Sequence, residues 1–111
     1  MTGQVDRIRW VDQHAVISMP AEIDATNADE IRQALFTAVS HNAAVLVIDM
    51  SQTTFCDSAG VQAIVAVRKL AETTGTQLRL AATTAALRVL TLVGVDQLIP
   101  VYPTLEAALT P

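Results

Sequence analysis

The feature that most constrains the fold is a run of apolar residues at 45–48, followed by a polar loop and then an apolar helix. Such a run predicts a strand buried on both faces, and the polar residues 51–54 end it. Asp57 or Ser58 can cap the helix, because either side-chain oxygen can accept from a free N–H of the first turn. A serine hydroxyl therefore lies at a helix start, beyond the carboxyl end of a central strand. In open α/β sheets, ligands and partners usually bind at that edge.

The amino-terminal half predicts a hairpin, a helix and a parallel crossover. The expected elements are strand 4–11, turn 12–13, strand 15–19 ended by Pro20, loop 22–27, helix 28–40 capped by Thr26 or Asn27, and strand 45–49. The strands alternate apolar and polar residues, and the helix has one apolar stripe. A strand–helix–strand crossover makes its two strands parallel, so their carboxyl ends share one edge. We therefore expect Asp24 and Ser58 to lie near each other.

The carboxyl-terminal half predicts three further helices and two strands. The expected elements are helix 58–73 closed by Gly75, a strand through Leu78 and Leu80, helix 84–93 capped by Thr83 or Thr84 and stopped by Gly94, edge strand 98–101, and a short helix from 103 to 109. In the third helix, Leu87, Leu90 and Val93 are expected to face inward. The sequence thus predicts an α/β domain with a mixed four- to five-stranded sheet, an amino-terminal hairpin, a parallel centre and three to four helices.

Helix 58–73 is apolar on almost every side for two turns. One face must pack on the sheet, which leaves a second face that is unusually apolar for a small domain. Two interpretations stay open at this point. Either a neighbouring helix covers the second face, or that face makes a contact with another protein.

Composition excludes several classes of protein. The chain has 111 residues, 51% of them hydrophobic, and a formal net charge of −4, which predicts one ordered domain over residues 1–111. Its seven scattered Lys and Arg residues cannot form the basic patch that nucleic acid requires. No apolar run approaches the roughly 20 residues of a membrane span, and no signal-peptide pattern is present. With a single cysteine, these features predict a cytoplasmic protein that binds neither nucleic acid nor membrane.

The sequence also argues against catalysis and metal binding. Ser58 is not in a Gly-x-Ser-x-Gly elbow, no Gly-rich phosphate loop is present, and neither His14 nor His41 can be paired with it. We therefore expect no enzyme, no catalytic residue, no cofactor and no metal site. Cys56 is expected to be buried and inert, because the neighbouring Asp57 disfavours a thiolate; a redox sensor is the alternative.

Three elements of the sequence, in order, resemble the STAS domains of anti-sigma factor antagonists. They are Ala21-Glu22-Ile23-Asp24-Ala25, then Ile48-Asp49-Met50 with Phe55-Cys56-Asp57-Ser58-Ala59-Gly60-Val61, and finally Leu87-Arg88-Val89-Leu90 with Val93-Gly94-Val95 and Leu98-Ile99. The central element holds the family's Asp-Ser-x-Gly signature. In the first, Ala21 replaces the family's glycine, which puts the shape of that loop in doubt. The resemblance covers nearly the whole chain.

The resemblance implies a binding protein controlled by phosphorylation. In that family the unphosphorylated form captures an anti-sigma factor serine kinase and so frees a sigma factor. The kinase uses ATP to phosphorylate a serine, which ends the capture, and a serine phosphatase resets the switch. The resemblance implies a non-switching accessory subunit as the alternative, on an ABC-transporter ATPase or in another multi-protein complex.

The site residues implied by the resemblance lie around the signature. Ser58 is the phosphate acceptor, and Asp24 lies beside it to position the serine or a kinase-bound metal. The implied partner-binding residues are Asp24, Asp57, Ser58, Ala59, Gly60 and Val61. The residues alone leave plainer roles open, with Ser58 as a simple helix cap and Asp24 as an exposed turn residue.

Overall fold

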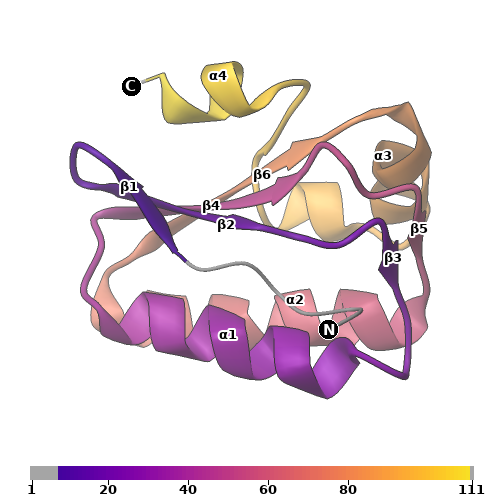
Figure 1. The fold of residues 1–111 in the computed structure, drawn as a ribbon, viewed down its shortest axis with the longest axis horizontal. Helices are drawn as coiled ribbons and strands as arrows, with labels where there is room; N and C mark the ends of the chain where they lie inside the picture. Colours follow the sequence, from indigo (N-terminus) through magenta and orange to yellow (C-terminus); the bar gives the residue numbers. More distant parts are fainter. Residues whose placement is uncertain (1–7, 111) are drawn as a thin grey trace.

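A five-stranded mixed sheet forms the centre of the computed structural model, which describes residues 8–110 (Figure 1). Its strands, in spatial order, are β1 (Arg9–Val11), β2 (His14–Ser18), β4 (Val45–Met50), β6 (Gln77–Ala82) and β7 (Val101–Tyr102). β1 pairs antiparallel with β2, and the other pairs are parallel. A separate parallel pair joins β3 (Glu22–Ile23) to β5 (Phe55–Cys56). The predicted α/β fold, with its hairpin and parallel centre, is confirmed.

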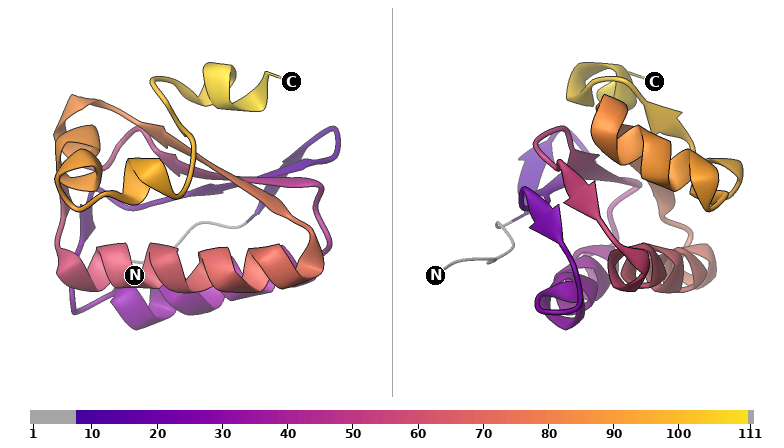
Figure 2. Two further views of the ribbon diagram at one scale, coloured as in Figure 1. Left: turned by 180° about the vertical axis from the view of Figure 1, so that it is seen from behind. Right: turned by 90° about the vertical axis from the view of Figure 1, so that its right-hand side faces the viewer.

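The helices cover the two faces of the sheet unequally. They are α1 (Ala28–Ser40), α2 (Ser58–Thr74), α3 (Thr84–Leu92), the short 3-10 helix η1 (Val95–Gln97) and α4 (Leu105–Leu109). α1 and α2 lie side by side across one face, α4 lies over the other, and α3 lies beside β5 (Figures 1 and 2). Within residues 8–110, no helix is long and apolar enough to cross a membrane.

β4 is the central strand, and all six of its residues are buried. Its side chains alternate between two apolar clusters because successive strand residues point to opposite faces. Leu46 and Ile48 join the cluster beneath α1 and α2, whereas Val45 and Val47 join the cluster beneath α4. This double coverage explains why the strand reads as an unbroken apolar run.

α4 is held to its face of the sheet by a buried arginine. Arg79 on β6 donates to the carbonyl oxygens of Ala108, at 2.8 Å, and Thr110, at 3.0 Å. The guanidinium also lies 5.9 Å from the centre of the Tyr102 ring. A cation at the carboxyl end of a helix satisfies free carbonyls and complements the helix dipole.

Three details of the predicted elements were wrong. Residues 22–23, expected in a loop, form β3, and the edge strand is Val101–Tyr102 rather than 98–101. In α3, Leu87 and Val93 are exposed, and the buried pair is Ala86 and Leu90. Only two residues of this short helix are buried, and Val93 lies one residue beyond the helix. Residues 4–7 of the predicted first strand lie outside the described residues.

Candidate functional site

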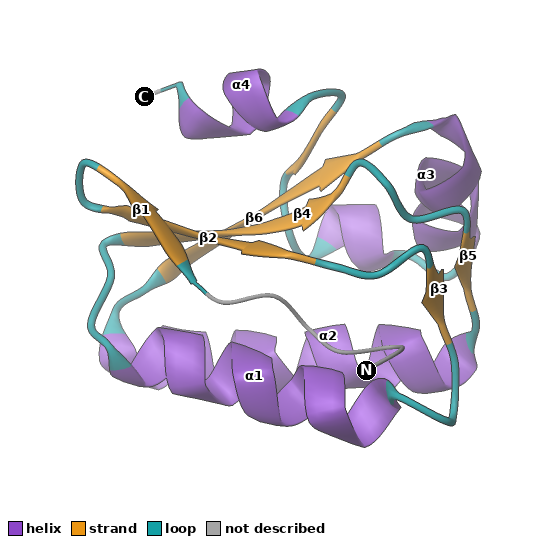
Figure 3. Cartoon of the chain, in the orientation of Figure 1, coloured by secondary structure: helices purple, strands orange, loops and turns teal. Residues whose placement is uncertain are grey.

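The β3–β5 pair brings two distant segments together at the carboxyl edge of the sheet (Figure 3). Ile23 is in register with Cys56, and the N–H of Asp57 donates to the carbonyl oxygen of Ile23 at 3.0 Å. Asp24 and Asp57 are therefore the next residues of two paired strands. The segment that carries Asp24 lies beside the start of α2, which Ser58 opens.

The start of α2 is capped by Asp57, which leaves Ser58 free. Asp57 Oδ1 accepts from the N–H groups of Ala59, at 3.0 Å, and Gly60, at 3.2 Å. Ser58 is the first helical residue and is exposed, and its hydroxyl makes no hydrogen bond with any of residues 8–110. Of the two possible caps, the fold uses the aspartate, so the serine is not needed for capping.

Gly60 has a packing role that no other residue could fill. It is buried, and a Cβ atom added there would lie 2.4 Å from Ile23 Cγ2 and 2.8 Å from Cys56 Sγ. The glycine thus lets the first turn of α2 approach β3 and β5 closely. Ala59 and Val61, on either side, are partly exposed.

The loop that carries Asp24 is fixed by short-range hydrogen bonds. The hydroxyl of Thr26 and, next in effect, its backbone N–H donate to Asp24 Oδ1 and lower the pKa of this carboxyl, so Asp24 is charged at neutral pH. Asn27 accepts from the N–H of Asp24 and donates to the carbonyl of Glu22. Asn27 occupies the predicted cap position of α1, but its side chain makes no cap bond there.

Ala21 fits where relatives carry glycine because its backbone needs no left-handed conformation. Among the described non-glycine residues, only Asp12 and Asn42 have positive φ. The carbonyl oxygen of Ala21 accepts from the N–H groups of Thr54, at 2.8 Å, and Phe55, at 3.2 Å. The doubt over the shape of this loop is thereby resolved, since the same pairing that holds β5 also holds the loop.

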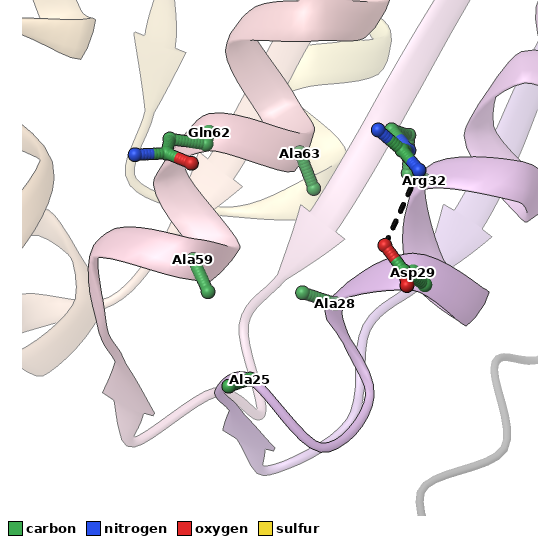
Figure 4. A pocket seen from close by; sticks show the side chains of 7 residues that line it. All are labelled: Ala25, Ala28, Asp29, Arg32, Ala59, Gln62 and Ala63. Carbon is green, nitrogen blue, oxygen red and sulfur yellow. Dashed lines mark hydrogen bonds and ion pairs between the residues drawn. The ribbon is translucent and has the colours of Figure 1, made fainter.

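Two hollows lie near this edge of the sheet, and one of them borders the start of α2. One, of about 190 Å³, lies between α1 and α2 and is lined by Ala25, Ala28, Asp29, Arg32, Ala59, Gln62 and Ala63 (Figure 4). Its volume is below that of typical small-molecule sites. The other lies over the loop and is lined by Pro20, Ala21, Glu22, Asp24, Thr26, Asn27 and Glu30.

The side chains around these hollows carry a net negative charge. Between Arg9 and Arg68 the sequence contains one cation, Arg32, among repeated Asp and Glu residues. Arg32 is itself paired with Asp29 at 3.2 Å. A partner that docks at this edge would meet a surface of uncompensated carboxylates.

One interpretation of the apolar face of α2, cover by a neighbouring helix, is confirmed in part, and the other, contact with another protein, stays a prediction. α1 packs along one flank of the helix. Val61, Val65 and Ala66 stay partly exposed and line a shallow hollow with Gln62 and Lys69. Ser58 lies three and four residues before Val61 and Gln62, so it continues the same helical face.

Cys56 is buried, as predicted, with 3% of its surface exposed. Burial and, to a smaller extent, the charge of Asp57 raise the pKa of the Cys56 thiol to about 11. The thiol is therefore protonated at neutral pH, and a protonated buried thiol is a poor nucleophile.

We expect a soluble maleimide to label native Cys56 far more slowly than the unfolded chain at pH 7. Cys56→Ala should lose only a small amount of stability, of about 1–2 kcal/mol, because one small buried group is removed. Labelling followed by intact mass, with and without urea, checks the first point, and urea titration checks the second. Equal labelling rates for native and unfolded protein would contradict the burial of this thiol.

Sequence reasoning missed one exposed residue of this edge. Phe55 is 51% exposed although it stands between a buried strand and a buried cysteine. The alternation of Phe55 with Cys56 was the available signal, but a two-residue strand is too short to establish a period.

These features define a class: a small α/β domain that presents an uncommitted serine at an aspartate-capped helix start, on the carboxyl edge of its sheet. The chain belongs to the STAS domain family, whose sequence profile matches residues 7–108. The resemblance found in the sequence is confirmed.

Solved structures agree with this assignment. An anti-sigma factor antagonist from Mycobacterium paratuberculosis is 29% identical, with a TM-score of 0.87 and coverage of 98% of this chain and 94% of that chain. The Bacillus cell fate determinant SpoIIAA, in its phosphorylated form, is 21% identical, with a TM-score of 0.67 and coverage of 91% and 94%. The murine anion transporter Slc26a9 is also 21% identical, with a TM-score of 0.71 and coverage of 90% of this chain but 18% of the transporter. The last two show the fold alone.

Proposed function

We propose that this chain is an anti-sigma factor antagonist whose binding is switched off by phosphorylation of Ser58. In its unmodified form it captures an anti-sigma factor serine kinase in the cytoplasm and so releases a sigma factor. The kinase ends the capture by transferring a phosphoryl group from ATP to the Ser58 hydroxyl, and a serine phosphatase restores the hydroxyl. The chain itself is a binding protein and not an enzyme.

The observation that carries this proposal is that Asp57, and not Ser58, caps α2. Asp57 caps α2, so the exposed Ser58 hydroxyl has no structural task within the described part of the chain. A phosphoryl group at the first residue of a helix is stabilised by the positive end of the helix dipole. Modification can therefore change the surface without unfolding the domain.

The partner surface follows from what is exposed near Ser58. Asp24, Asp57, Ala59 and Val61 are all partly exposed at this edge and can touch a docked kinase. Gly60 is buried, so its contribution is to hold the start of α2 in place. The apolar stripe of α2 extends the surface away from the serine.

Phosphorylation by the kinase tests the proposal. Incubation with ATP and the anti-sigma factor serine kinase of the same genome should add one phosphate to the wild type and none to Ser58→Ala, as measured by intact mass. Thr54→Ala is a matched control, because Thr54 is also exposed at this edge but its hydroxyl is bonded to the Ala21 carbonyl. Phosphorylation that persists in Ser58→Ala would sink the assignment of the acceptor.

An accessory subunit of a transporter or other multi-protein complex is the second candidate. The likeness to the fold of Slc26a9, which is an anion transporter, is the observation that favours it. Such a subunit would bind its partner equally well whether or not Ser58 is modified. Affinity that does not respond to phosphorylation would move this candidate to first place.

A further inference from the structure

Phe55 is presented outward from a backbone that is fixed on both sides. Its N–H donates to the carbonyl oxygen of Ala21 at 3.2 Å, and it stands in register with Glu22 of β3. The next residue, Cys56, is buried, so the alternation of the strand directs Phe55 away from the core. An aromatic ring on a fixed strand loses little conformational freedom when it binds.

The fold buries only about half of the Phe55 side chain. Phe55 belongs to neither of the two apolar clusters formed by the described residues, and half of its surface is exposed. Single exposed apolar residues are common, so exposure alone decides nothing. The position of Phe55 favours a role in binding, because Phe55 lies three residues before Ser58, on the strand that leads into the capped helix.

The surroundings of Phe55 define what could cover it. α3 lies beside β5 at this end of the molecule and exposes Leu87, which is 38% exposed (Figure 2). On the β3 side stand the carboxylates of Glu22 and Asp57, whereas α3 carries the exposed Arg88 next to Leu87. On its β3 side the ring therefore has an acidic border, and the complement of that side is an apolar socket bordered by cations.

We propose that Phe55 is the aromatic anchor of the partner interface, and that its ring enters an apolar socket bordered by Lys or Arg side chains on the anti-sigma factor serine kinase. This inference rests on the proposed function and adds a residue and a socket chemistry to it. Buried aromatic anchors dominate the affinity of many interfaces, and surrounding polar contacts exclude water from them. Leu87 would lie at the margin of the covered surface.

The test compares two exposed apolar residues by calorimetric titration with the purified kinase of the same genome and ADP. Phe55→Ala should bind about 30-fold more weakly than wild type, the loss typical of an interface anchor. Leu92→Ala is the matched control, because Leu92 is 79% exposed at the far end of α3, and it should bind within twofold of wild type. Both variants should melt at the wild-type temperature. Phe55→Leu, which keeps an apolar side chain, should recover part of the affinity.

Three outcomes would overturn the anchor. If Phe55→Ala binds within twofold of the wild type, Phe55 is not an anchor, and the proposed function stands. An equal loss in Leu92→Ala shows that the effect is not specific to this position. Absence of binding by the wild type removes the proposed function and the anchor together. If Phe55→Ala melts early, both Phe55 variants are titrated at a temperature where both are folded. Lost affinity in Phe55→Ala that is partly recovered in Phe55→Leu then supports the anchor, and binding of Phe55→Ala within twofold of wild type overturns it.

Discussion

Gly60→Val is expected to destabilise the domain by about 3 kcal/mol, near the upper end of the range for overpacked cores. The first added carbon would already lie 2.4 Å from Ile23 Cγ2 and 2.8 Å from Cys56 Sγ. The Cys56 side chain can rotate, but Ile23 is a fully buried, branched residue whose backbone is paired to β5. The clash must therefore be relieved by moving α2 away from the β3–β5 pair.

Ala59→Val is the matched control for this prediction. It introduces the same side chain one residue earlier in the same helix, where the position is partly exposed and borders a hollow. Its cost should be about 0.5 kcal/mol, the helix-propensity difference between alanine and valine. Urea titrations of both variants measure the two losses. Equal stability of the two variants would show that the close approach at Gly60 is not needed.

Phosphorylation of Ser58 is expected to weaken binding to the kinase by about a hundredfold or more. The phosphate adds a charge of about −1.5 to −2 at neutral pH, next to Asp57 and close to the segment that carries Asp24. Against an interface fitted to a hydroxyl, added charge and bulk should cost several kcal/mol, and each 1.4 kcal/mol is tenfold in affinity. The Asp24 carboxyl is charged at neutral pH, so the phosphate adds to negative charge already present on this surface.

Ser58→Asp should reproduce much of this loss while its circular dichroism spectrum stays that of the wild type. The fold tolerates the charge because Ser58 lies at the positive end of the α2 helix dipole. Ser40→Asp is a useful control, since Ser40 is also exposed but lies at the opposite end of α1 from the site. It should bind as the wild type does. Equal losses of affinity in Ser58→Asp and Ser40→Asp would show that any added negative charge weakens binding, whatever its position.

The main architecture could be predicted because its sequence patterns span many residues and have simple physical causes. β4 reads as an unbroken apolar run since both of its faces are covered, and the crossover through α1 makes β2 and β4 parallel. The turn residues Gly75 and Gly94 marked helix ends correctly because both adopt positive φ. Helix ends with positive φ favour glycine, or asparagine as at Asn42 after α1, so the sequence can specify them locally.

The finer geometry of the site could not be predicted because it depends on tertiary pairing. β3 and β5 have two residues each, and nothing in either segment shows which partner it will find. The sequence could not choose between Asp57 and Ser58 as the cap, because both have suitable side-chain oxygens. Leu87 and Val93 were placed inward on helical spacing alone, whereas α3 touches the core only through Ala86 and Leu90.

In the proposed switch the Ser58 hydroxyl controls binding, and calorimetric titration of the two forms of the chain measures its effect. The wild-type chain, unmodified or carrying one phosphate on Ser58, is titrated into the purified kinase with ADP, and urea titration of both forms confirms that the fold is kept. We expect tight binding by the unmodified form and about a hundredfold or more weaker binding by the phosphorylated form. A phosphorylated chain that binds as tightly as the unmodified chain would contradict it.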